Sequence, residues 1–280
     1  IMLRNERARL TVIPELGGRV VDYRLNGGEN VLLADPASWE DPSRIPLPSG
    51  TAPWREFQGH VYWVSPQDEF WKHQDVNPKR SGRWPPDPYL VYGDFKPVEQ
   101  SRSRLLLRGP RSKVSGIQMT KTFELKPDGS VHISVSALNI RNAPLSWAIW
   151  SNTRVGIDAF PYVRLHEKSF VRLAEFKTHQ PLAGTQVRYL VEEDFLGIVT
   201  QSLPDGFERQ HGKLFITDPA DNAIATFSGN VLFIKRAPET SKRYLPPDHG
   251  FIELYHRRQP AKTSITELEM HGRYRRMAPG

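Results

Sequence analysis

The chain contains no cysteine among its 280 residues, which excludes disulfide bonds, thiol catalysis and cysteine-ligated zinc. It also lacks any apolar run of the roughly 18 residues needed to cross a bilayer, so we expect no membrane span. Its nine histidines are scattered, without the His-x-His or His-Glu-x-x-His spacing typical of metal sites. We therefore expect neither a dedicated metal site nor a cofactor.

Several other functional motifs are missing. No Gly-x-Ser-x-Gly elbow marks a hydrolase nucleophile, and no phosphate-binding loop is present. Gly17-Gly18 is not a dinucleotide fingerprint, because no helix is expected after it and the third glycine is absent. Cleavage of glycosides by paired carboxylates stays open, since it depends on their separation in space. The carboxylates that could pair in this way are Asp68, Asp87, Asp158 and Glu253.

The net charge of +7 raises nucleic acid as a partner. However, the basic residues are interspersed with carboxylates, and no zinc finger, basic zipper or RNA-recognition signature is found. We therefore predict a solvated basic surface and no nucleic-acid partner. The same charge would favour an acidic ligand, such as a uronate or a sugar phosphate, through long-range steering.

Twenty-four prolines and 20 glycines leave little room for long helices. Segments 104–109, 117–125 and 131–139 alternate well between apolar and polar residues, and many later segments also resemble short strands. Only 169–176 and 203–210 are expected to form short helices. Many short strands joined by turns predict a mostly antiparallel, all-β sandwich. No linker or repeat interrupts it, so we expect a single domain over residues 1–280.

The opening of the chain has the strongest hairpin signals. Two strand-like runs flank Gly17-Gly18, and Asn26-Gly27-Gly28 turns the chain again, because glycine tolerates the positive φ of such turns. This opening resembles the first hairpin of the galactose mutarotase-like superfamily, which includes the aldose 1-epimerases and glucose-6-phosphate 1-epimerases. In that superfamily, a Pro-x-x-Gly-Gly-(Arg or Lys) turn precedes a strand. The resemblance implies a β-supersandwich.

Two further segments extend the resemblance over most of the chain. Gln58-Gly-His-Val-Tyr-Trp-Val-Ser-Pro-Gln67 is similar to the strand and loop that carry Gly-Gly-x-x-x-x-Trp-Pro-Gln in the sugar-phosphate epimerases, although Gln58 replaces the first glycine. Together with the Trp84-Pro-Pro-Asp-Pro88 loop, it is most similar to a bacterial family of unknown function within the superfamily.

The region between Trp54 and Pro88 has the composition of a carbohydrate site, because sugars present an apolar face to aromatic rings and a rim of hydroxyls to polar groups. Consecutive prolines are expected to hold Asp87 on a stiff segment. The alternative is that the tryptophans only cap one end of the sandwich. The candidate platforms are Trp63, Trp71 and Trp84, and the candidate polar contacts are Arg55, His60, Gln67, Asp68 and Asp87.

The resemblance also implies a catalytic base. Mutarotases use a glutamate to remove the anomeric proton and a histidine to protonate the ring oxygen. The late-strand glutamate of that pattern matches Glu253 in His249-Gly-Phe-Ile-Glu-Leu-Tyr-His256. Its neighbours Ile252 and Leu254 are expected to raise its pKa. The alternative is an outward-facing carboxylate paired with Arg257 or Lys262.

The expected histidine is replaced. The family pattern Ala-Leu-His-x-Tyr-Phe-x-Val corresponds here to Ala148-Ile-Trp-Ser-Asn-Thr-Arg-Val155, which places Trp150 at the histidine position. Tryptophan cannot deliver a proton at physiological pH, so ordinary mutarotase activity is in doubt. His60 or His166 could supply the proton from elsewhere. Trp150, Asn152 and Arg154 remain candidates for contact with the sugar.

These observations predict a carbohydrate-binding protein. One form of the prediction is an enzyme, such as an aldose epimerase-like isomerase, that acts on a sugar or uronate by acid–base chemistry. The alternatives are a non-catalytic glycan-binding module and a structural envelope protein. We expect a bacterial protein located in the periplasm or outside the cell.

Overall fold

The computed structural model describes residues 1–82, 84–174, 187–199, 210–258 and 264–280. The chain divides into two compact units, which are described one at a time. Unit 1 comprises Ile1–Ser151 and Tyr274–Gly280, and unit 2 comprises Asn152–Arg273. A single domain over residues 1–280 stays a prediction. Among the described residues, no helix has both the length and the apolar character needed to span a membrane.

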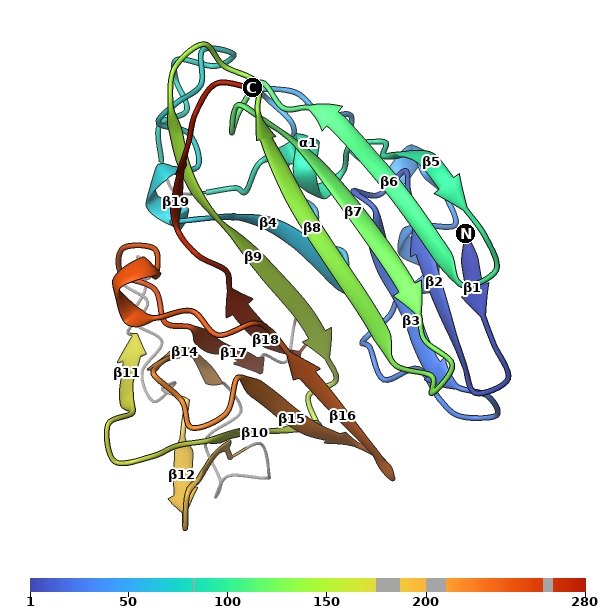
Figure 1. Cartoon of the computed structure of the whole chain (residues 1–280), viewed down its shortest axis with the longest axis vertical. Coiled ribbons are helices and arrows are strands. Elements are labelled where there is room, and N and C mark those ends of the chain that lie inside the picture. The colour runs from blue at the N-terminus through green and yellow to red at the C-terminus, as the bar shows by residue number, and fades with distance from the viewer. Residues whose placement is uncertain (83, 175–186, 200–209, 259–263) are drawn as a thin grey trace. The chain divides into compact units, whose positions relative to one another are not determined.

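Unit 1 contains two β-sheets, drawn mostly in blue and green in Figure 1. The first has the strand order β1-β2-β3-β4-β9. Its strands are β1 (Met2–Arg4), β2 (Ala8–Ile13), β3 (Arg19–Leu25), β4 (His60–Ser65) and β9 (Leu145–Val155). The last residues of β9 belong to unit 2. The second has the order β5-β6-β7-β8: β5 (Lys96–Gln100), β6 (Arg104–Arg111), β7 (Ile117–Leu125) and β8 (Val131–Asn139). A short strand, β19 (Arg275–Met277), pairs with β9.

The few helices of unit 1 are short. They are the 3₁₀ turns η1 (Pro36–Ser38), η2 (Pro42–Arg44) and η3 (Gln67–Glu69), and the α-helix α1 (Pro88–Val91). Both sheets contribute fully buried apolar residues to the core, including Val12 of β2, Leu107 of β6 and Phe123 of β7. The alternating burial of β7 therefore reflects one face turned to the core and one turned away from it.

The opening hairpin is formed by β2 and β3, as the sequence predicts. Gly17 has a φ of +68°, and a Cβ on it would lie 2.6 Å from the Leu90 carbonyl oxygen. Only glycine fits such a position, because both the conformation and the close approach exclude a side chain. The ammonium of Lys121 donates a 2.6 Å hydrogen bond to the carbonyl of Gly17, which ties this turn to β7.

Unit 2 also contains two antiparallel sheets. One has the order β18-β17-β14-β11: β11 (Phe170–Ala174), β14 (Gln210–Thr217), β17 (Ile252–Arg258) and β18 (Ile265–His271). The other has the order β12-β13-β10-β15-β16: β10 (Phe160–Arg164), β12 (Tyr189–Glu192), β13 (Phe195–Ile198), β15 (Ala223–Ser228) and β16 (Val231–Arg236). One 3₁₀ turn, η4 (Lys242–Tyr244), precedes β17.

The all-β, mostly antiparallel fold with few short helices confirms the sequence prediction. Segments 104–109, 117–125 and 131–139 lie in β6, β7 and β8. The helix expected over 169–176 is wrong where that segment is described, because Phe170–Ala174 pairs with β14 as strand β11. Residues 203–209 of the second expected helix lie outside the described residues, and Gln210 begins β14.

Candidate functional site

The sheet formed by β14, β17 and β18 has two contrasting faces. Every second residue points into the apolar core of unit 2, as Leu214, Leu254 and Leu268 do. Successive strand residues alternate between faces, so the residues between them share the opposite face. Besides the partly buried rings of Phe215 and Tyr255, that face carries charged and polar residues that are buried: Lys213, Glu253, Glu267, Glu269 and His271.

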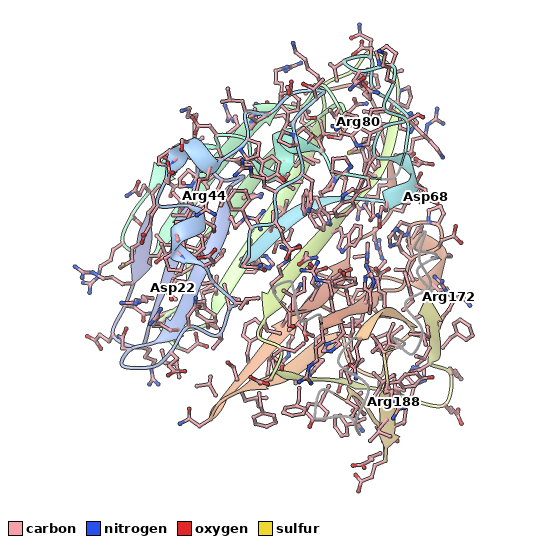
Figure 2. All side chains as sticks on the ribbon, turned by 180° about the vertical axis from the view of Figure 1, so that it is seen from behind. Asp22, Arg44, Asp68, Arg80, Arg172 and Arg188 are labelled. Atoms are coloured by element: carbon pink, nitrogen blue, oxygen red, sulfur yellow. The ribbon has the colours of Figure 1, made fainter. Side chains whose placement is uncertain are left out.

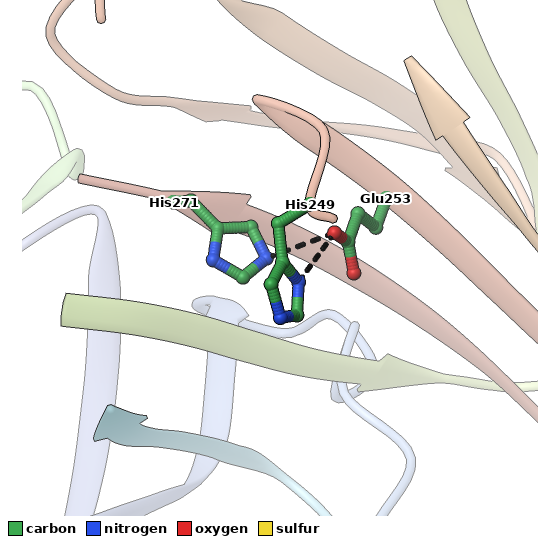
Figure 3. Close-up of side chains that lie close together, drawn as sticks. All are labelled: His249, Glu253 and His271. Atoms are coloured by element: carbon green, nitrogen blue, oxygen red, sulfur yellow. Dashed lines mark hydrogen bonds and ion pairs between the residues drawn. The ribbon is translucent and has the colours of Figure 1, made fainter. Parts of the chain in front are cut away.

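Glu253 is the most heavily contacted carboxylate of this face. Its side chain is 0% exposed. Its Oε1 atom lies 2.8 Å from Nδ1 of His249 and 3.3 Å from Nε2 of His271 (Figure 3). The backbone N–H of Gly250 donates to the same oxygen at 3.0 Å. His249 lies just before β17 and His271 ends β18, so two neighbouring strands and one loop fix the carboxylate.

Lys213 links two glutamates on neighbouring strands. Glu253 of β17 and Glu269 of β18 lie directly opposite each other in the ladder. The Nζ atom of Lys213 lies 2.6 Å from Oε2 of Glu253 and 2.5 Å from Oε2 of Glu269. A single buried ammonium is therefore shared by two buried carboxyl groups.

Two residues of β9 complete the cluster. Asn152 donates a 3.3 Å hydrogen bond to Oε1 of Glu269. Nε of Arg154 lies 2.7 Å from Oε1 of Glu267, in an ion pair that is almost fully buried. Isolated buried charges are costly, so the glutamates depend on these partners. We define the polar cluster as Asn152, Arg154, Lys213, His249, Glu253, Glu267, Glu269 and His271.

The cluster shifts the pKa values of its two central carboxyl groups in opposite directions. Burial alone would raise the pKa of Glu253, but the Lys213 ammonium holds it well below its usual range. Burial raises the pKa of Glu269 well above its usual range, and the carboxylates of Glu267 and Glu253 add to this against the opposing effect of Lys213. Burial also lowers the pKa of His271 to about 4, which leaves its imidazole neutral at neutral pH.

The direction of the Glu253 shift is opposite to the sequence expectation. The apolar neighbours Ile252 and Leu254 point into the core on the other face of β17, so they do not surround the carboxylate. The alternative, an outward-facing carboxylate paired with Arg257, also fails because Glu253 is buried and pairs with Lys213. Lys262 lies outside the described residues.

His249, Glu253 and His271 also have donor atoms suited to a metal ion. One ligand atom from each lies within 4.8 Å of the other two, and two imidazoles with one carboxylate form a set that zinc can accept. A dication would, however, compete with the Lys213 ammonium for Glu253. The hydrogen bonds and ion pairs account for these contacts, and we assign no metal ion to them.

The remaining predicted residue of unit 2, His166, is not a member of the polar cluster. It follows β10, is exposed, and its Nε2 atom lies 4.0 Å from the Asp218 carboxylate. In contrast, Asn152, Arg154 and Glu253 are all members of the polar cluster.

Arg172 of β11 is held over the Phe215 ring at 4.0 Å and is labelled in Figure 2.

In unit 1, two of the three residues predicted as platforms, Trp63 and Trp84, form one aromatic group with Trp54. The Trp54 ring centroid lies 4.7 Å from that of Trp84 and 6.4 Å from that of Trp63. Trp63 is buried and packs edge-on against Trp150 at 5.4 Å. Trp84 is 48% exposed, so it is the predicted platform with the most open ring.

Two predicted contact residues of unit 1 have structural partners. Trp71 is buried, donates from Nε1 to the carbonyl of Pro85, and stacks against Arg80 at 4.6 Å. Asp87 is also buried, and its carboxylate accepts from the N–H groups of Tyr89 and Ser115. Asp87 therefore caps α1, and its predicted contact with a sugar stays a prediction.

The other predicted residues of unit 1 lie on β4 or in nearby loops. His60 is buried in β4, with its ring 4.7 Å from that of Tyr62. The backbone N–H of Arg55 donates to the hydroxyl of Tyr92 at 2.8 Å, while its side chain is exposed. Gln67 and Asp68 begin η3, and Asp68 is exposed and labelled in Figure 2. Their roles stay predictions.

The family model for the domain of unknown function DUF4380 matches residues 1–280. The chain belongs to the DUF4380 family. Among curated protein sequences, none matches it.

Solved structures resemble this DUF4380 chain over almost its whole length. A galactose mutarotase-like protein from Lactobacillus casei has a TM-score of 0.59 at 12% identity, covering 97% of this chain and 87% of the other. A galactose mutarotase-related enzyme from Lactobacillus acidophilus has a TM-score of 0.54 at 9% identity, covering 100% and 93%. The Slr1438 protein from Synechocystis sp. PCC 6803 has a TM-score of 0.54 at 15% identity, covering 100% and 90%. This likeness establishes the galactose mutarotase-like fold and confirms the predicted resemblance.

Sequence reasoning missed most of the polar cluster of this DUF4380 chain. The missed residues are Lys213, His249, Glu267, Glu269 and His271. A signal was present in Thr266-Glu-Leu-Glu-Met-His271, where polar and apolar residues alternate as they do in a half-buried strand. Such a pattern normally indicates a solvated face, so the burial of these charges became visible only in the structure.

Proposed function

We propose that this protein binds a carbohydrate and acts on it by acid–base chemistry at the polar cluster of unit 2. The observation that carries the proposal is the pairing of Glu253 with Glu269. The two carboxyl groups lie opposite each other, share the Lys213 ammonium, and have pKa values displaced in opposite directions. Two neighbouring carboxyl groups whose pKa values differ can act as base and acid at the same pH.

In this proposal, Glu253 is the proton acceptor. It stays ionised because Lys213 stabilises its charge, and its oxygens are held in place by His249 and Gly250. A fixed carboxylate of this kind can take a proton from a sugar hydroxyl if that hydroxyl comes within hydrogen-bond reach. This role agrees with the one that the family resemblance implies for Glu253.

Glu269 is the proton donor in the same proposal. Its raised pKa favours the protonated form, which is the form that can give a proton to a ring oxygen. This role removes the difficulty posed by Trp150, because a carboxylic acid replaces the histidine that the related epimerases use. His60 and His166 are then not needed as acids.

The carbohydrate part of the proposal is supported by the fold and, as a separate sugar-binding surface, by the aromatic group of unit 1 taken by itself. The galactose mutarotase-like fold is shared with proteins whose names refer to sugar chemistry. The half-open ring of Trp84, next to Trp54, suits the apolar face of a sugar. The proposal extends to an acidic sugar as ligand, favoured by the +7 net charge, and to a periplasmic or secreted location.

Cleavage of a glycosidic bond between Glu253 and Glu269 is disfavoured. A retaining or inverting glycosidase leaves the space between its two carboxyl groups open for the scissile bond or a water molecule. Here the Lys213 ammonium contacts both carboxyl groups and occupies that space. Ring opening breaks the bond between the anomeric carbon and the ring oxygen as Glu253 takes the anomeric hydroxyl proton and Glu269 protonates the ring oxygen. It needs no attacking water or nucleophile between the two carboxyl groups, so it fits this arrangement better.

The test is NMR exchange spectroscopy between the α and β anomers of galactose, glucose, glucuronate and galacturonate. We expect at least one anomeric pair to interconvert faster with the protein than in buffer, and both E253Q and E269Q to remove the acceleration. E239Q, at an exposed carboxylate of unit 2, is the matched control and should keep it. Binding of a sugar without any acceleration would favour the non-catalytic glycan-binding module instead.

A further inference from the structure

The outer face of the β12-β13-β10 sheet in unit 2 is unusually apolar. Tyr162 of β10 lies opposite Gly197 of β13, which in turn lies opposite Leu190 of β12. Residues opposite each other in an antiparallel ladder point to the same side. Tyr162 is 36%, Leu190 57% and Phe195 46% exposed. Large exposed apolar groups gathered on one face commonly mark a binding surface.

This face contains a cavity of about 430 Å³. Three aromatic rings, those of Phe160, Tyr162 and Phe195, contribute to its wall. Gly197 contributes no side chain, and a Cβ there would lie 3.3 Å from the Tyr162 ring. The glycine therefore lets the tyrosine ring lie close over the backbone of β13. The volume falls within the range of small-molecule sites.

The charged residues of the cavity all have the same sign. Glu192 and Glu193 line it, and among the described residues that line it there is no lysine, arginine or histidine. Arg164, on the same face of β10, lies 3.9 Å from Asp194 and 3.8 Å from Asp221, so its charge is already balanced. In a protein with a net charge of +7, this cavity is a local acidic and aromatic site.

Aromatic faces and carboxylates attract the same kind of ligand. The face of an aromatic ring carries partial negative charge and binds cations, most strongly when they are partly desolvated. A carboxylate next to the ring adds a direct electrostatic attraction. An anionic ligand would be repelled by both groups, and a strongly polar neutral ligand would find few hydrogen-bond partners among the apolar lining residues.

We propose that the cavity between β10, β12 and β13 binds a small organic cation with an ammonium group on an apolar body. The aromatic rings of Phe160, Tyr162 and Phe195 would contact the apolar body and the cationic head, and Glu192 and Glu193 would balance the charge. The site is independent of the proposed sugar chemistry, because it lies on the second sheet of unit 2 and shares no residue with the polar cluster.

The test uses benzyltrimethylammonium as the probe, with benzyl alcohol and phenylmethanesulfonate as neutral and anionic controls. Binding is measured by calorimetry and by amide shifts of Tyr162 and Gly197 in ¹⁵N-labelled full chain. We expect the cation to bind in the micromolar to millimolar range, the alcohol to bind about tenfold more weakly, and the sulfonate not to bind. Absence of binding by the cation, or equal binding of the alcohol, would overturn the proposal.

Three variants assign the binding to this cavity. The double change Glu192→Gln and Glu193→Gln alters exposed residues, should leave the fold intact, and should weaken binding of the cation about tenfold without affecting the alcohol. Tyr162→Leu should also weaken it, whereas Tyr162→Phe should retain it. If the double variant binds the cation as tightly as the wild type does, the site is not this cavity. A monomer–dimer equilibrium abolished by the same double change would assign the face to a second copy instead.

Discussion

Asp87 in unit 1 and Glu253 in unit 2 are 1% and 0% exposed, yet their surroundings differ in kind. Within the described part of the chain, Asp87 accepts hydrogen bonds from neutral groups: the Ser112 hydroxyl and the N–H groups of Tyr89 and Ser115. Burial raises its pKa. Glu253 instead pairs with the Lys213 ammonium, which holds its pKa well below the usual range.

The difference separates a structural carboxylate from a candidate catalytic one. Neutral donors at Asp87 fix the start of α1 and join it to the loop after β6. Neutral hydrogen-bond donors are sufficient to fix this loop, so Asp87 needs no charged partner. The polar cluster around Glu253 places several ionisable groups in contact, which costs stability unless every charge is paired. Such costs are characteristic of sites whose charges take part in chemistry.

Glu253→Gln provides the largest expected effect. Glutamine keeps the shape and the hydrogen-bonding reach of the side chain but cannot take up a proton. We expect any anomer interconversion to fall by roughly 10²–10⁴-fold, with affinity for the sugar changing by less than about tenfold, or roughly 1.4 kcal/mol. NMR exchange rates and calorimetry measure the two quantities. Glu239→Gln is the control, since it changes an exposed carboxylate outside the polar cluster and should leave the turnover unchanged.

Asp87→Ala should affect stability in place of turnover. It removes the α1 cap, a loss of about 1 kcal/mol, and leaves the buried Ser112 hydroxyl short of its acceptor, at roughly 1–3 kcal/mol. The Ser115 N–H keeps Oγ of Ser112 as an acceptor at 3.1 Å. We expect the free energy of unfolding to fall by about 2–4 kcal/mol in urea titrations. A fall of less than about 0.5 kcal/mol, which is typical of surface changes, would remove the structural role that the comparison assigns to Asp87.

Much of the fold could be predicted from the sequence, but the buried partners that distinguish Glu253 from Asp87 could not. The Gly17-Gly18 hairpin and the alternation of β6, β7 and β8 are local signals, and local signals survive folding. Glu253 was found because of the resemblance. Its partners Lys213 and Glu269 were missed, because charged residues on strands normally face solvent and only the tertiary structure reveals their burial.

The structural role of Asp87, unlike the partners of Glu253, could have been predicted from the sequence. The consecutive prolines predict a stiff segment, whereas the Asp87-Pro88 pair is also a helix-start signal, with aspartate at the N-cap and proline at the first helical position. That signal was available in the sequence and was not used. The helix expected over 169–176 failed for a different reason. Pairing of β11 with β14 overrides weak local helix propensity.

The different exposure of two tryptophans in unit 1 predicts a smaller effect, on the affinity for the sugar. Trp84 is 48% exposed, whereas Trp71 is 1% exposed and held by Pro85 and Arg80. Trp84→Ala should weaken binding of the sugar by roughly 1–3 kcal/mol, as expected for loss of an aromatic contact. Trp84→Phe keeps an aromatic face and should recover part of the affinity. If calorimetry gives the same dissociation constant for all three proteins, Trp84 is not a platform.

The opposite pKa directions of Asp87 and Glu253 predict opposite pH dependences, the smallest of the expected effects. The pKa of Glu253 is lower in the folded than in the unfolded state. Its stabilising contribution is therefore present above the ordinary glutamate pKa of about 4.3 and is lost as the pH falls through the folded value. Asp87 has a raised pKa, so its contribution is present below about 3.9 and is lost as the pH rises through the folded value.

Glu253→Gln should therefore lessen the loss of stability on acidification, and Asp87→Asn should increase it. Urea unfolding between about pH 6 and about pH 3 covers the window in which both groups titrate in the unfolded chain. The effect of Glu253→Gln is expected to be modest, because the Glu253 charge is one cause of the raised pKa of Glu269. Removing that charge lowers the pKa of Glu269, which then carries part of the acid dependence that Glu253 loses. If both variants shift the acid dependence in the same direction, the two carboxylates do not differ in the way that their partners predict.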